Sequence, residues 1–593
     1  MISLKVILIS LFGLYLVGLM GIMYHYGPHR ARELDGVNRD MKFLEMSNRN
    51  SYMPAKKMFQ FSDKTLALEI LRQLDGYKPV DDTYYRELGR NKNKFYEPYL
   101  GMIPDDQYCD KHRAAFVQNP QTFFDNMNMV LTSGVNHLIR AKAIPSIAVD
   151  IHPEIGDSMP IVDRDRHTYD VSPDANFYWM VTNMYKYRHI GKHYACLTQE
   201  SNQVPGSEIM SRKDTIAEAA TRFGNKFAHK PHCFNHDKFF PKTWLLADKK
   251  DCKEFFKIFS SEEYERLKAE RKIVYIRKIG AGSHRGEGVQ PVTDEEEAEL
   301  RRVYANGIKC GEITKNYIIQ HYVHNPLLLE GHKFDFRMYM LIASTNPVMA
   351  YYHDGFLRVT LADYDANSVD KKVLLTNLAL NKQIYDDVKG GHLYEGMDEE
   401  ELKIAQQWSM ERLQDYLLKI GKINSTTWLD DYLRPEFKKA MIHLVRMSAH
   451  TFWENSALYE LYGVDFMLDD DLNLWFIELN SGPAIGGYSQ PMERFIVKMV
   501  QDHFEVVNGL LKSRMKRIVT YINKLIDEKQ VVMGENGKVV VPEAAKVIFT
   551  EISRNHFEIE YEPKPGNGFS LIVDRNHDNF YQYMNIVGQS CFS

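Results

Sequence analysis

The chain has 593 residues, of which 44% are apolar and 26% are charged, the balance of a folded globular protein of roughly two to four domains. A disordered scaffold is excluded. The net charge of −5 and a pI near 6.5 argue against a general nucleic-acid binder, which would carry a strongly basic domain, so we expect no nucleic-acid partner.

The first element in chain order is an apolar segment, Val6 to Met23, which contains no charged residue. It is just long enough to span a bilayer as a helix. The bulky residues that follow it favour an uncleaved anchor over a signal peptide, which would have a small-residue cleavage site. Basic residues at His29, Arg30 and Arg32 favour a cytoplasmic body. The sequence therefore predicts a single-pass membrane protein with the remainder of the chain in the cytoplasm.

The next segment, to about residue 165, is polar and aromatic and carries no motif with assignable chemistry. Short helices are expected at Lys64 to Leu74 and at Phe123 to Lys142. The cysteines of the whole chain lack CxxC pairs or zinc spacing, and we interpret them as reduced core thiols, although their even number leaves disulfides in a lumen open. They are Cys109, Cys196, Cys233, Cys252, Cys310 and Cys591. One N-glycosylation sequon, at Asn424, is too common by chance to carry weight.

Strands and helices alternate after residue 173. Ser211 is expected to cap a helix that runs through Ala220, Glu262 to Arg271 to form a charged helix, and Ile273 to Ile279 to form a strand. A glycine-rich turn follows that strand. Its glycines would let backbone N–H groups approach phosphate oxygens, with Lys278 at the strand end and Arg285 adding charge. The turn is neither a Walker A loop nor a Rossmann GxGxxG, and a mobile surface loop is the alternative.

A second strand begins at Lys333. Alternation places Lys333, Asp335 and Arg337 on one face, opposite the apolar residues between them. Three charges of mixed sign indicate either a salt-bridged exterior or the wall of a phosphate site. Arg358 stands further along, just after an expected turn at Asp354-Gly355.

The most informative stretch sets two acids into adjoining apolar runs. Val464 to Leu468 and Leu474 to Leu479 are expected to form a hairpin, with acidic residues supplying the turn. A register that pairs Asp465 with Glu478 would put both carboxylates on one face, with Asn480 two residues further along it. Such oxygen donors suit a hard cation such as magnesium together with phosphate oxygens. A plain hairpin with solvated acids is the alternative.

The order of these pieces resembles the tubulin tyrosine ligase-like family. Its members carry a Lys before a loop ending RGxGI, a QxYI hinge, NPLLxxGxKFDxR, HLTN, and GxDx(12)ExN. The match covers about residues 175 to 500. The blocks NPLL…KFDFR and GVDF…IELNSGP are specific enough that chance explains them poorly.

The resemblance implies an α+β ATP-grasp fold, here behind an N-terminal membrane-anchor helix, with ATP and Mg²⁺ as cofactors. It implies ligation of an amino acid, glutamate above all, to a carboxylate of tubulin through an acyl phosphate, as in a tubulin polyglutamylase. The expected partners are tubulin or microtubules, a free amino acid and, through the N-terminal helix, a membrane, with microtubule or cilium association. The expected domains are an anchor at 1–26, a region of unknown role at 27–170, the ligase domain at 171–510, and a basic helix and tail at 511–593.

The resemblance also assigns roles to residues. The residues expected to contact the phosphates of ATP are Lys278, Arg285, Gly286 and Lys333. The expected adenine hinge comprises Gln320, His321, Tyr322 and Val323. The residues expected to complete the nucleotide site are Phe334, Asp335, Thr376 and Asn377. The expected magnesium ligands are Asp465, Glu478 and Asn480. Arg337 would lie near the phosphoryl group, and Arg358 would clamp a carboxylate of the amino acid.

Departures from the family pattern leave alternatives open. Leu374 replaces the family's His before LTN, and Leu378-Ala379 replace the Tyr-Ser of glutamate- and glycine-adding members. A nucleotide- or tubulin-binding pseudoenzyme at a membrane is therefore one alternative, and a ligase facing a lumen with a non-tubulin acceptor is another. Acidic tubulin tails could also dock on a basic helix face near the C-terminus. That face would comprise Lys512, Arg514, Lys516, Arg517, Lys524 and Lys529.

Overall fold

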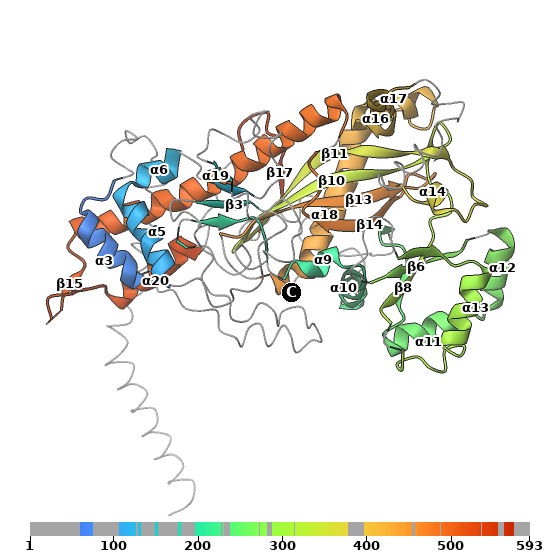
Figure 1. Ribbon diagram of the computed structural model, residues 1–593, viewed down its shortest axis with the longest axis horizontal. Coiled ribbons are helices and arrows are strands. Elements are labelled where there is room, and N and C mark those ends of the chain that lie inside the picture. The colour runs from blue at the N-terminus through green and yellow to red at the C-terminus, as the bar shows by residue number, and fades with distance from the viewer. Residues whose placement is uncertain are drawn as a thin grey trace, which may run out of the picture.

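The computed structural model describes residues 60–74, 106–125, 129–131, 149–151, 176–179, 196–197, 199–204, 206–226, 229, 238–271, 273–280, 288–313, 315–376, 397–452, 457–486, 488–534, 536–554 and 563–574. A seven-stranded antiparallel sheet lies at its centre, a four-stranded antiparallel sheet projects to one side, and a small parallel sheet lies toward the other end (Figure 1). The expected α+β class is confirmed.

The large sheet has the strand order β12-β11-β10-β13-β14, with β17 paired to β11 and β9 to β10. Its strands are β9 (Leu328–Leu329), β10 (His332–Thr345), β11 (Val348–Asp363), β12 (Gln407–Trp408), β13 (Glu460–Leu468), β14 (Leu474–Ser481) and β17 (Ser570–Asp574). Shorter helices lie beside it: α14 (Lys371–Leu374), α16 (Glu399–Gln406), α17 (Met410–Lys419), the π-helix η4 (Leu429–Leu433) and the 3₁₀ turn η5 (Ala449–Thr451). The two long strands β10 and β11 carry several of the expected site residues, among them Lys333, Asp335, Arg337 and Arg358.

The alternation expected along β10 is confirmed. Phe334, Phe336 and Met338 are fully buried in an apolar core beneath α18 (Arg434–Ser448), where the rings of Phe336 and Phe437 lie 5.1 Å apart. The opposite face carries the charged residues at one end of the strand and apolar residues at the other. Only the apolar end belongs to the core formed with the long helix α19 (Gln490–Asp527). The charged end is therefore left for a site.

The turn expected at Asp354-Gly355 is wrong, because both residues lie inside β11. A Cβ on Gly355 would come within 1.7 Å of the carbonyl oxygen of Arg337 on β10. Glycine is thus required by the close approach of two strands rather than by a turn. Asp354 instead pairs with Arg434 of α18, whose Nη2 lies 2.6 Å from its carboxylate.

The small sheet has the order β5-β8-β6-β7 and its own apolar core around Trp244, Phe255 and Tyr275. It comprises β5 (Thr243–Leu245), β6 (Tyr275–Ile279), β7 (Val289–Pro291) and β8 (Tyr317–His321), with helices α11 (Lys249–Ile258), α12 (Glu262–Glu270) and α13 (Asp294–Val303). We call these elements the small lobe. The expected strand after residue 273 and the charged helix from Glu262 are confirmed.

Helices α9 (Glu208–Ser211) and α10 (Lys213–Lys226) lie between the small lobe and the large sheet (Figure 1). The expected cap at Ser211 is wrong, because Ser211 is the last residue of α9 and its hydroxyl donates to the carbonyl oxygen of Glu208. The chain turns at Arg212 and starts a second helix at Lys213. This break places a lysine at the start of α10, facing β14.

The N-terminal part packs against α19. It comprises α3 (Lys64–Leu74), α5 (Asp106–Gln118), α6 (Pro120–Asp125) and the parallel strands β1 (Met129–Leu131), β2 (Val149–Ile151), β3 (Phe177–Trp179) and β4 (Glu200–Ser201). Helix α3 is confirmed. The helix expected from Phe123 to Lys142 is wrong, because α6 ends at Asp125 and β1 pairs with β2 and β3, partners that local periodicity cannot reveal.

Helix α19 has 38 residues and runs uninterrupted through residue 510, where a domain boundary was expected. The basic face expected on this helix is wrong in part, because Arg514 and Arg517 are buried. Arg514 lies 3.6 Å from the carboxylate of Glu200. Beyond α19 the chain adds the hairpin β15 (Val532–Met533) and β16 (Val539–Val540) and the helix α20 (Glu543–Arg554), which packs on α3 and α19.

Within these described ranges, no helix combines the length and the apolar composition needed to cross a bilayer. The single-pass membrane localisation expected from the sequence is therefore contradicted. The segment Val6 to Met23, on which that expectation depended, lies outside the described residues.

The interpretation of the cysteines as reduced thiols is wrong for every cysteine that the structure describes. Cys109 is bonded to Cys196, and Cys252 is bonded to Cys310. The cysteines of each pair are separated by 87 and 58 residues, so pairing could not be read from local spacing.

Candidate active site

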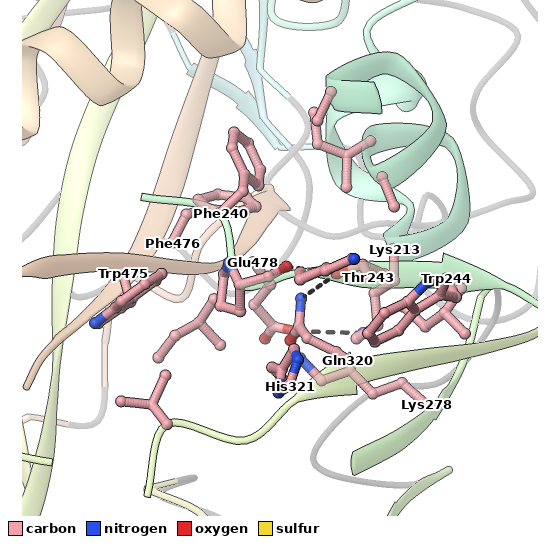
Figure 2. A pocket seen from close by; sticks show the side chains of 18 of the residues that line it. Lys213, Phe240, Thr243, Trp244, Lys278, Gln320, His321, Trp475, Phe476 and Glu478 are labelled. Atoms are coloured by element: carbon pink, nitrogen blue, oxygen red, sulfur yellow. Dashed lines mark hydrogen bonds and ion pairs between the residues drawn. The ribbon is translucent and has the colours of Figure 1, made fainter. Parts of the chain in front are cut away.

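A cavity of about 860 Å³ lies between the small lobe and strand β14, with α9 and α10 closing a third side. Figure 2 shows side chains from these elements directed into the same space. Several residues expected at the site line it together: Lys278, Gln320, His321, Tyr322, Val323 and Glu478. The cavity thus joins residues from both lobes, and two of them, Lys278 and Glu478, are 200 residues apart in the sequence.

Lys278 lies at the end of β6 and is almost fully buried. Its Nζ donates to Oε1 of Gln320 at 2.6 Å, and Nε2 of Gln320 donates to the hydroxyl of Thr243 at 2.9 Å. Burial, with a smaller contribution from the nearby Lys213, lowers the pKa of Lys278 to about 8. A desolvated ammonium group held by a neutral amide would be stabilised by any anion that entered the cavity.

Lys213, at the start of α10, is a site residue that the sequence reasoning missed. Its Nζ lies 3.1 Å from Oε2 of Glu478 on β14, and Figure 2 shows the two side chains meeting at the cavity wall. The sequence contained a signal for this role. A basic residue in the first turn of a helix is unfavourable next to the positive end of the helix dipole, so its presence there indicates a partner elsewhere in the fold. Burial raises the pKa of Glu478, but Lys213 and Lys278 more than offset this and hold it below its ordinary value.

Two aspartates and two arginines form a buried network on the charged end of the large sheet. Arg358 donates to both oxygens of Asp335, at 2.7 and 2.6 Å, and Arg337 donates to both oxygens of Asp465, at 2.6 and 3.0 Å. Nη2 of Arg358 also reaches Asp465 at 2.8 Å and joins the two pairs. We call these four residues the arginine–aspartate network. Each pair stands directly across neighbouring strands, which fixes its geometry.

The two acids of the network respond differently to burial, which outweighs Arg358 and raises the pKa of Asp335. Burial acts to raise the pKa of Asp465, but Arg337 and Arg358 together hold it below its ordinary value. When both acids are ionised they balance the two guanidinium groups, and the network then has no net charge. Arginine can present further N–H donors to a planar anion, which suits the network for recognising a carboxylate or a phosphoryl group.

Lys333 is buried on the same strand and links β10 to the loop that carries the LTN residues. Its Nζ donates to the carbonyl oxygen of Leu374 at 2.8 Å and to the hydroxyl of Tyr322 at 3.3 Å. Burial lowers its pKa to about 8. Thr376 donates a short hydrogen bond to Asp335. Leu374 packs against Tyr322, so the residue in place of the family's His makes an apolar contact.

The expected register of the acidic hairpin is confirmed, since Asp465 pairs with Glu478 and Gly463 with Asn480. The structure adds a β-bulge, because Phe466 pairs with Phe476 and leaves Ile477 as the extra residue. Without the bulge, alternation from Phe476 would turn Glu478 into the core. Nδ2 of Asn480 donates to Asp465 at 3.3 Å, so the three residues are neighbours on one face.

The chemistry of these three residues fits a hard cation, because two carboxylates and an amide oxygen are the donors that magnesium accepts. The side chain of Glu478 is 31% exposed, whereas both oxygens of Asp465 are held by guanidinium groups. No group of three His, Cys, Asp or Glu side chains suited to a metal occurs in the part of the chain that the structure describes. The amide oxygen of Asn480 would therefore be needed as the third ligand of a magnesium ion, beside Asp465 and Glu478.

Not every expected site residue joins the cavity. Phe334 lies in the apolar core on the opposite face of β10. Seven other expected residues are described by the structure but do not line the cavity: Lys333, Asp335, Arg337, Arg358, Thr376, Asp465 and Asn480. Arg285, Gly286 and Asn377 lie outside the described residues. Thr243 and Trp475, which the sequence reasoning did not select, line the cavity beside the expected residues (Figure 2).

Comparison with known proteins gives consistent findings. Residues 189–516 match the model of the tubulin-tyrosine ligase family. The chain is 28% identical to a protein polyglycylase, TTLL10, of Macaca fascicularis over 51% of its own length and 47% of the relative's. It is 25% identical to a probable beta-tubulin polyglutamylase of Tetrahymena thermophila, over 70% and 32% of the two lengths. It is 26% identical to an inactive polyglycylase, TTLL10, of Homo sapiens, over 51% and 43%. The chain thus spans less than half the length of each of these relatives.

Proposed function

Because the chain belongs to the tubulin-tyrosine ligase family, we propose that it is an ATP- and magnesium-dependent ligase that joins an amino acid to a protein carboxylate in an ATP-grasp site. The observation that carries the proposal is the convergence of Lys213, Lys278 and Glu478 in one cavity between two lobes. Two cationic side chains and a carboxylate around one space suit a polyphosphate with its metal ion.

In the proposed reaction the acceptor carboxylate takes the terminal phosphoryl group of ATP, which gives an acyl phosphate and ADP. The amine of the incoming amino acid then displaces phosphate, forms an amide bond and loses a proton. Such chemistry needs positive charge around the transferring group more than covalent help from the protein. Lys213, Lys278 and Arg337 would supply that charge.

The nucleotide would be held by groups from both lobes. Its base would contact the hinge from Gln320 to Val323, and its phosphates would be bound by Lys278 and Lys333. Magnesium would be held by Asp465, Glu478 and Asn480 and would neutralise charge on the phosphate oxygens. The remaining expected contacts are Arg285, Gly286, Asp335, Thr376 and Asn377.

The amino acid and the acceptor are the finer parts of the proposal. Arg358 would clamp a carboxylate of the amino acid, since its guanidinium already binds two carboxylates at 2.6 to 2.8 Å. We propose glutamate as the amino acid and tubulin as an acceptor, as the name of the Tetrahymena relative indicates for that protein. Glycine is the competing amino acid, because other relatives are named polyglycylases.

The test is to incubate the full chain with ATP, magnesium, tubulin and a mixture of labelled amino acids, and to analyse the tubulin tails by mass spectrometry. We expect added residues whose mass identifies the amino acid, and their loss in Glu478→Gln. Glu436→Gln, at a partly exposed acid paired with Lys439 away from the cavity, is the matched control and should retain the activity. ATP binding without incorporation into any acceptor would favour the pseudoenzyme.

Nucleotide binding should depend on pH through Lys278. Its pKa of about 8 in the free protein is low because burial disfavours the charged form, and bound phosphate would favour that form. Binding near and above pH 8 should therefore take up protons, and the affinity should fall as the pH rises through this range. Calorimetry in buffers of different ionisation enthalpy measures the uptake. The Lys278→Met variant should lose part of this proton uptake, and the Lys333→Met variant should lose the other part. Proton uptake that is unchanged in both variants would contradict the role of these two lysines in nucleotide binding.

A further inference from the structure

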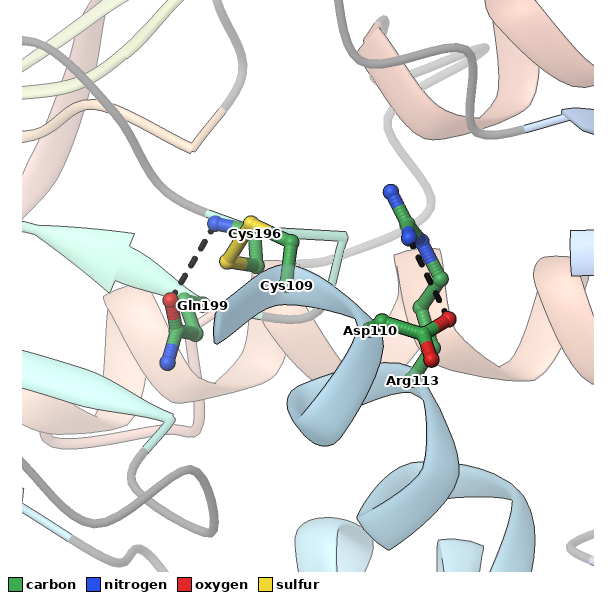
Figure 3. The surroundings of a disulfide bond; sticks show 5 residues. All are labelled: Cys109, Asp110, Arg113, Cys196 and Gln199. Carbon is green, nitrogen blue, oxygen red and sulfur yellow. Dashed lines mark hydrogen bonds and ion pairs between the residues drawn. A yellow bond between two sulfur atoms is a disulfide. The ribbon is translucent and has the colours of Figure 1, made fainter. Parts of the chain in front are cut away.

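Among the residues that the structure describes, two disulfide bonds link separate segments, one in the N-terminal part and one in the small lobe. Cys109 of α5 is bonded to Cys196, which precedes β4, and Figure 3 shows the bond between the helix and that strand. Cys252 of α11 is bonded to Cys310, which follows α13 in the small lobe. The Cα atoms are 5.5 and 5.7 Å apart, the usual separation for a relaxed disulfide.

Each bond is built into its surroundings. All four sulfur-bearing side chains are at most 3% exposed. The backbone N–H of Cys196 donates to Oε1 of Gln199 at 3.1 Å, which fixes the turn that presents it to α5 (Figure 3). Cys252 packs in the small-lobe core beside Phe255 and Phe256. Buried structural disulfides are typical of oxidising compartments and rare in the cytosol.

The sequon at Asn424 does not indicate a compartment by itself, but the structure shows that it is accessible to modification in this one. The only N-x-Ser/Thr sequon in the sequence is Asn424-Ser425-Thr426, and it lies in the loop between α17 and η4. Asn424 and Thr426 are exposed and belong to neither helix nor strand. The loop is held in place from both sides, because Nε2 of Gln414 donates to the carbonyl oxygen of Thr426 at 2.8 Å and Lys422 pairs with Asp470 at 2.8 Å. An exposed sequon in an ordered surface loop is accessible to glycosylation.

We propose that this chain folds in an oxidising compartment of the secretory pathway, where both disulfides form and Asn424 carries an N-linked oligosaccharide. The side-chain amide nitrogen of Asn424 would form a bond to C1 of a sugar. The C1–O bond to a lipid diphosphate donor would break, and the amide would lose a proton. Each disulfide would form as two thiols lose two protons and pass two electrons to a protein disulfide, which is reduced to a dithiol.

The compartment in which the chain folds can be tested independently of the proposed ligase activity. If the proposed ligase activity also holds, its acceptor in that compartment would be a protein with exposed acidic side chains, in place of tubulin. The disulfides and the glycan can be measured on protein that has no ligase activity. A chain without the disulfides and the glycan can therefore be distinguished from a chain without ligase activity.

The test is to express the full chain in animal cells and to measure its electrophoretic mobility before and after treatment with peptide N-glycosidase. We expect a glycosidase-sensitive shift in the wild type and in Thr426→Ser, which keeps the sequon. The shift should be absent in Asn424→Gln and in Thr426→Ala. Two ways of removing the sequon keep the result interpretable if one variant fails to fold. Absence of the shift from folded wild-type protein would overturn the glycan assignment.

The disulfides are tested on the same samples by alkylating free thiols in denaturant before reduction and identifying cross-linked peptides by mass spectrometry. We expect peptides that join Cys109 to Cys196 and Cys252 to Cys310, and alkylation of these cysteines only after reduction. Full alkylation of all four without reduction would overturn the oxidising compartment.

Discussion

Replacing Lys213 with Met should lower the rate of amino-acid incorporation about 10²- to 10³-fold, the loss that follows removal of one well-placed donor to developing charge. The ammonium group opens α10 and lies 3.1 Å from Glu478 at the cavity wall, with only 17% of the side chain exposed. Its removal would leave the phosphoryl group with one cation fewer and would leave Glu478 without this partner. Initial rates at saturating ATP measure the effect.

The matched control is Lys226→Met, at the other end of the same helix, where the side chain is exposed and lies outside the cavity. This variant should keep the wild-type rate. Both variants should unfold within a few degrees of the wild type, because neither residue belongs to an apolar core. A Lys213→Met protein that retains the wild-type rate would remove Lys213 from the site.

Replacing Asp465 with Ala should lower the free energy of unfolding by about 3 to 5 kcal/mol, the usual cost of removing one partner of a buried ion pair. The side chain of Asp465 is 3% exposed and holds both Arg337 and Arg358. Its loss would leave Arg337 buried without its carboxylate and Arg358 with Asp335 alone. Equilibrium unfolding in urea at neutral pH measures the difference.

The difference in unfolding free energy between the wild type and Asp465→Ala should depend on pH in one direction. Because the pKa of Asp465 is held below its ordinary value in the folded protein, its stabilisation is fully present above about pH 4. It is lost as the pH falls further through the folded pKa. The gap between wild type and Asp465→Ala should therefore narrow in acid. Asp470→Ala, at an exposed acid paired with Lys422, is the control and should cost less than about 1 kcal/mol.

The sequence predicted the acidic hairpin and the charged face of β10 because both follow from local alternation. Asp465 and Glu478 interrupt apolar runs, and Lys333, Asp335 and Arg337 recur with period 2, so their faces could be assigned without a structure. The bulge at Ile477 was not predicted, because it depends on how β13 and β14 pair and leaves no local mark.

What the sequence could not provide depends on contacts between distant segments. Gly355 appeared to mark a turn, but the backbone of β10 beside it is what requires glycine. Lys213 gained its role only when α10 met β14. The cysteines looked like isolated thiols because their partners stand 87 and 58 residues away. In each case the missing information was the tertiary partner, and composition and periodicity do not contain it.

Helix α3, the last turns of α19 and the segments after it belong to one core, although they come from opposite ends of the described chain. The N–H of Ser62 donates to Asn523 at 2.9 Å, and the N–H of Val541 donates to Gln73 at 3.0 Å. Because synthesis proceeds from the N-terminus, α3 leaves the ribosome long before the residues that bury Ile70 and Leu71 exist. This end of the molecule must therefore complete its folding after almost the whole chain has been made, and contacts of such long sequence separation should make that step slow.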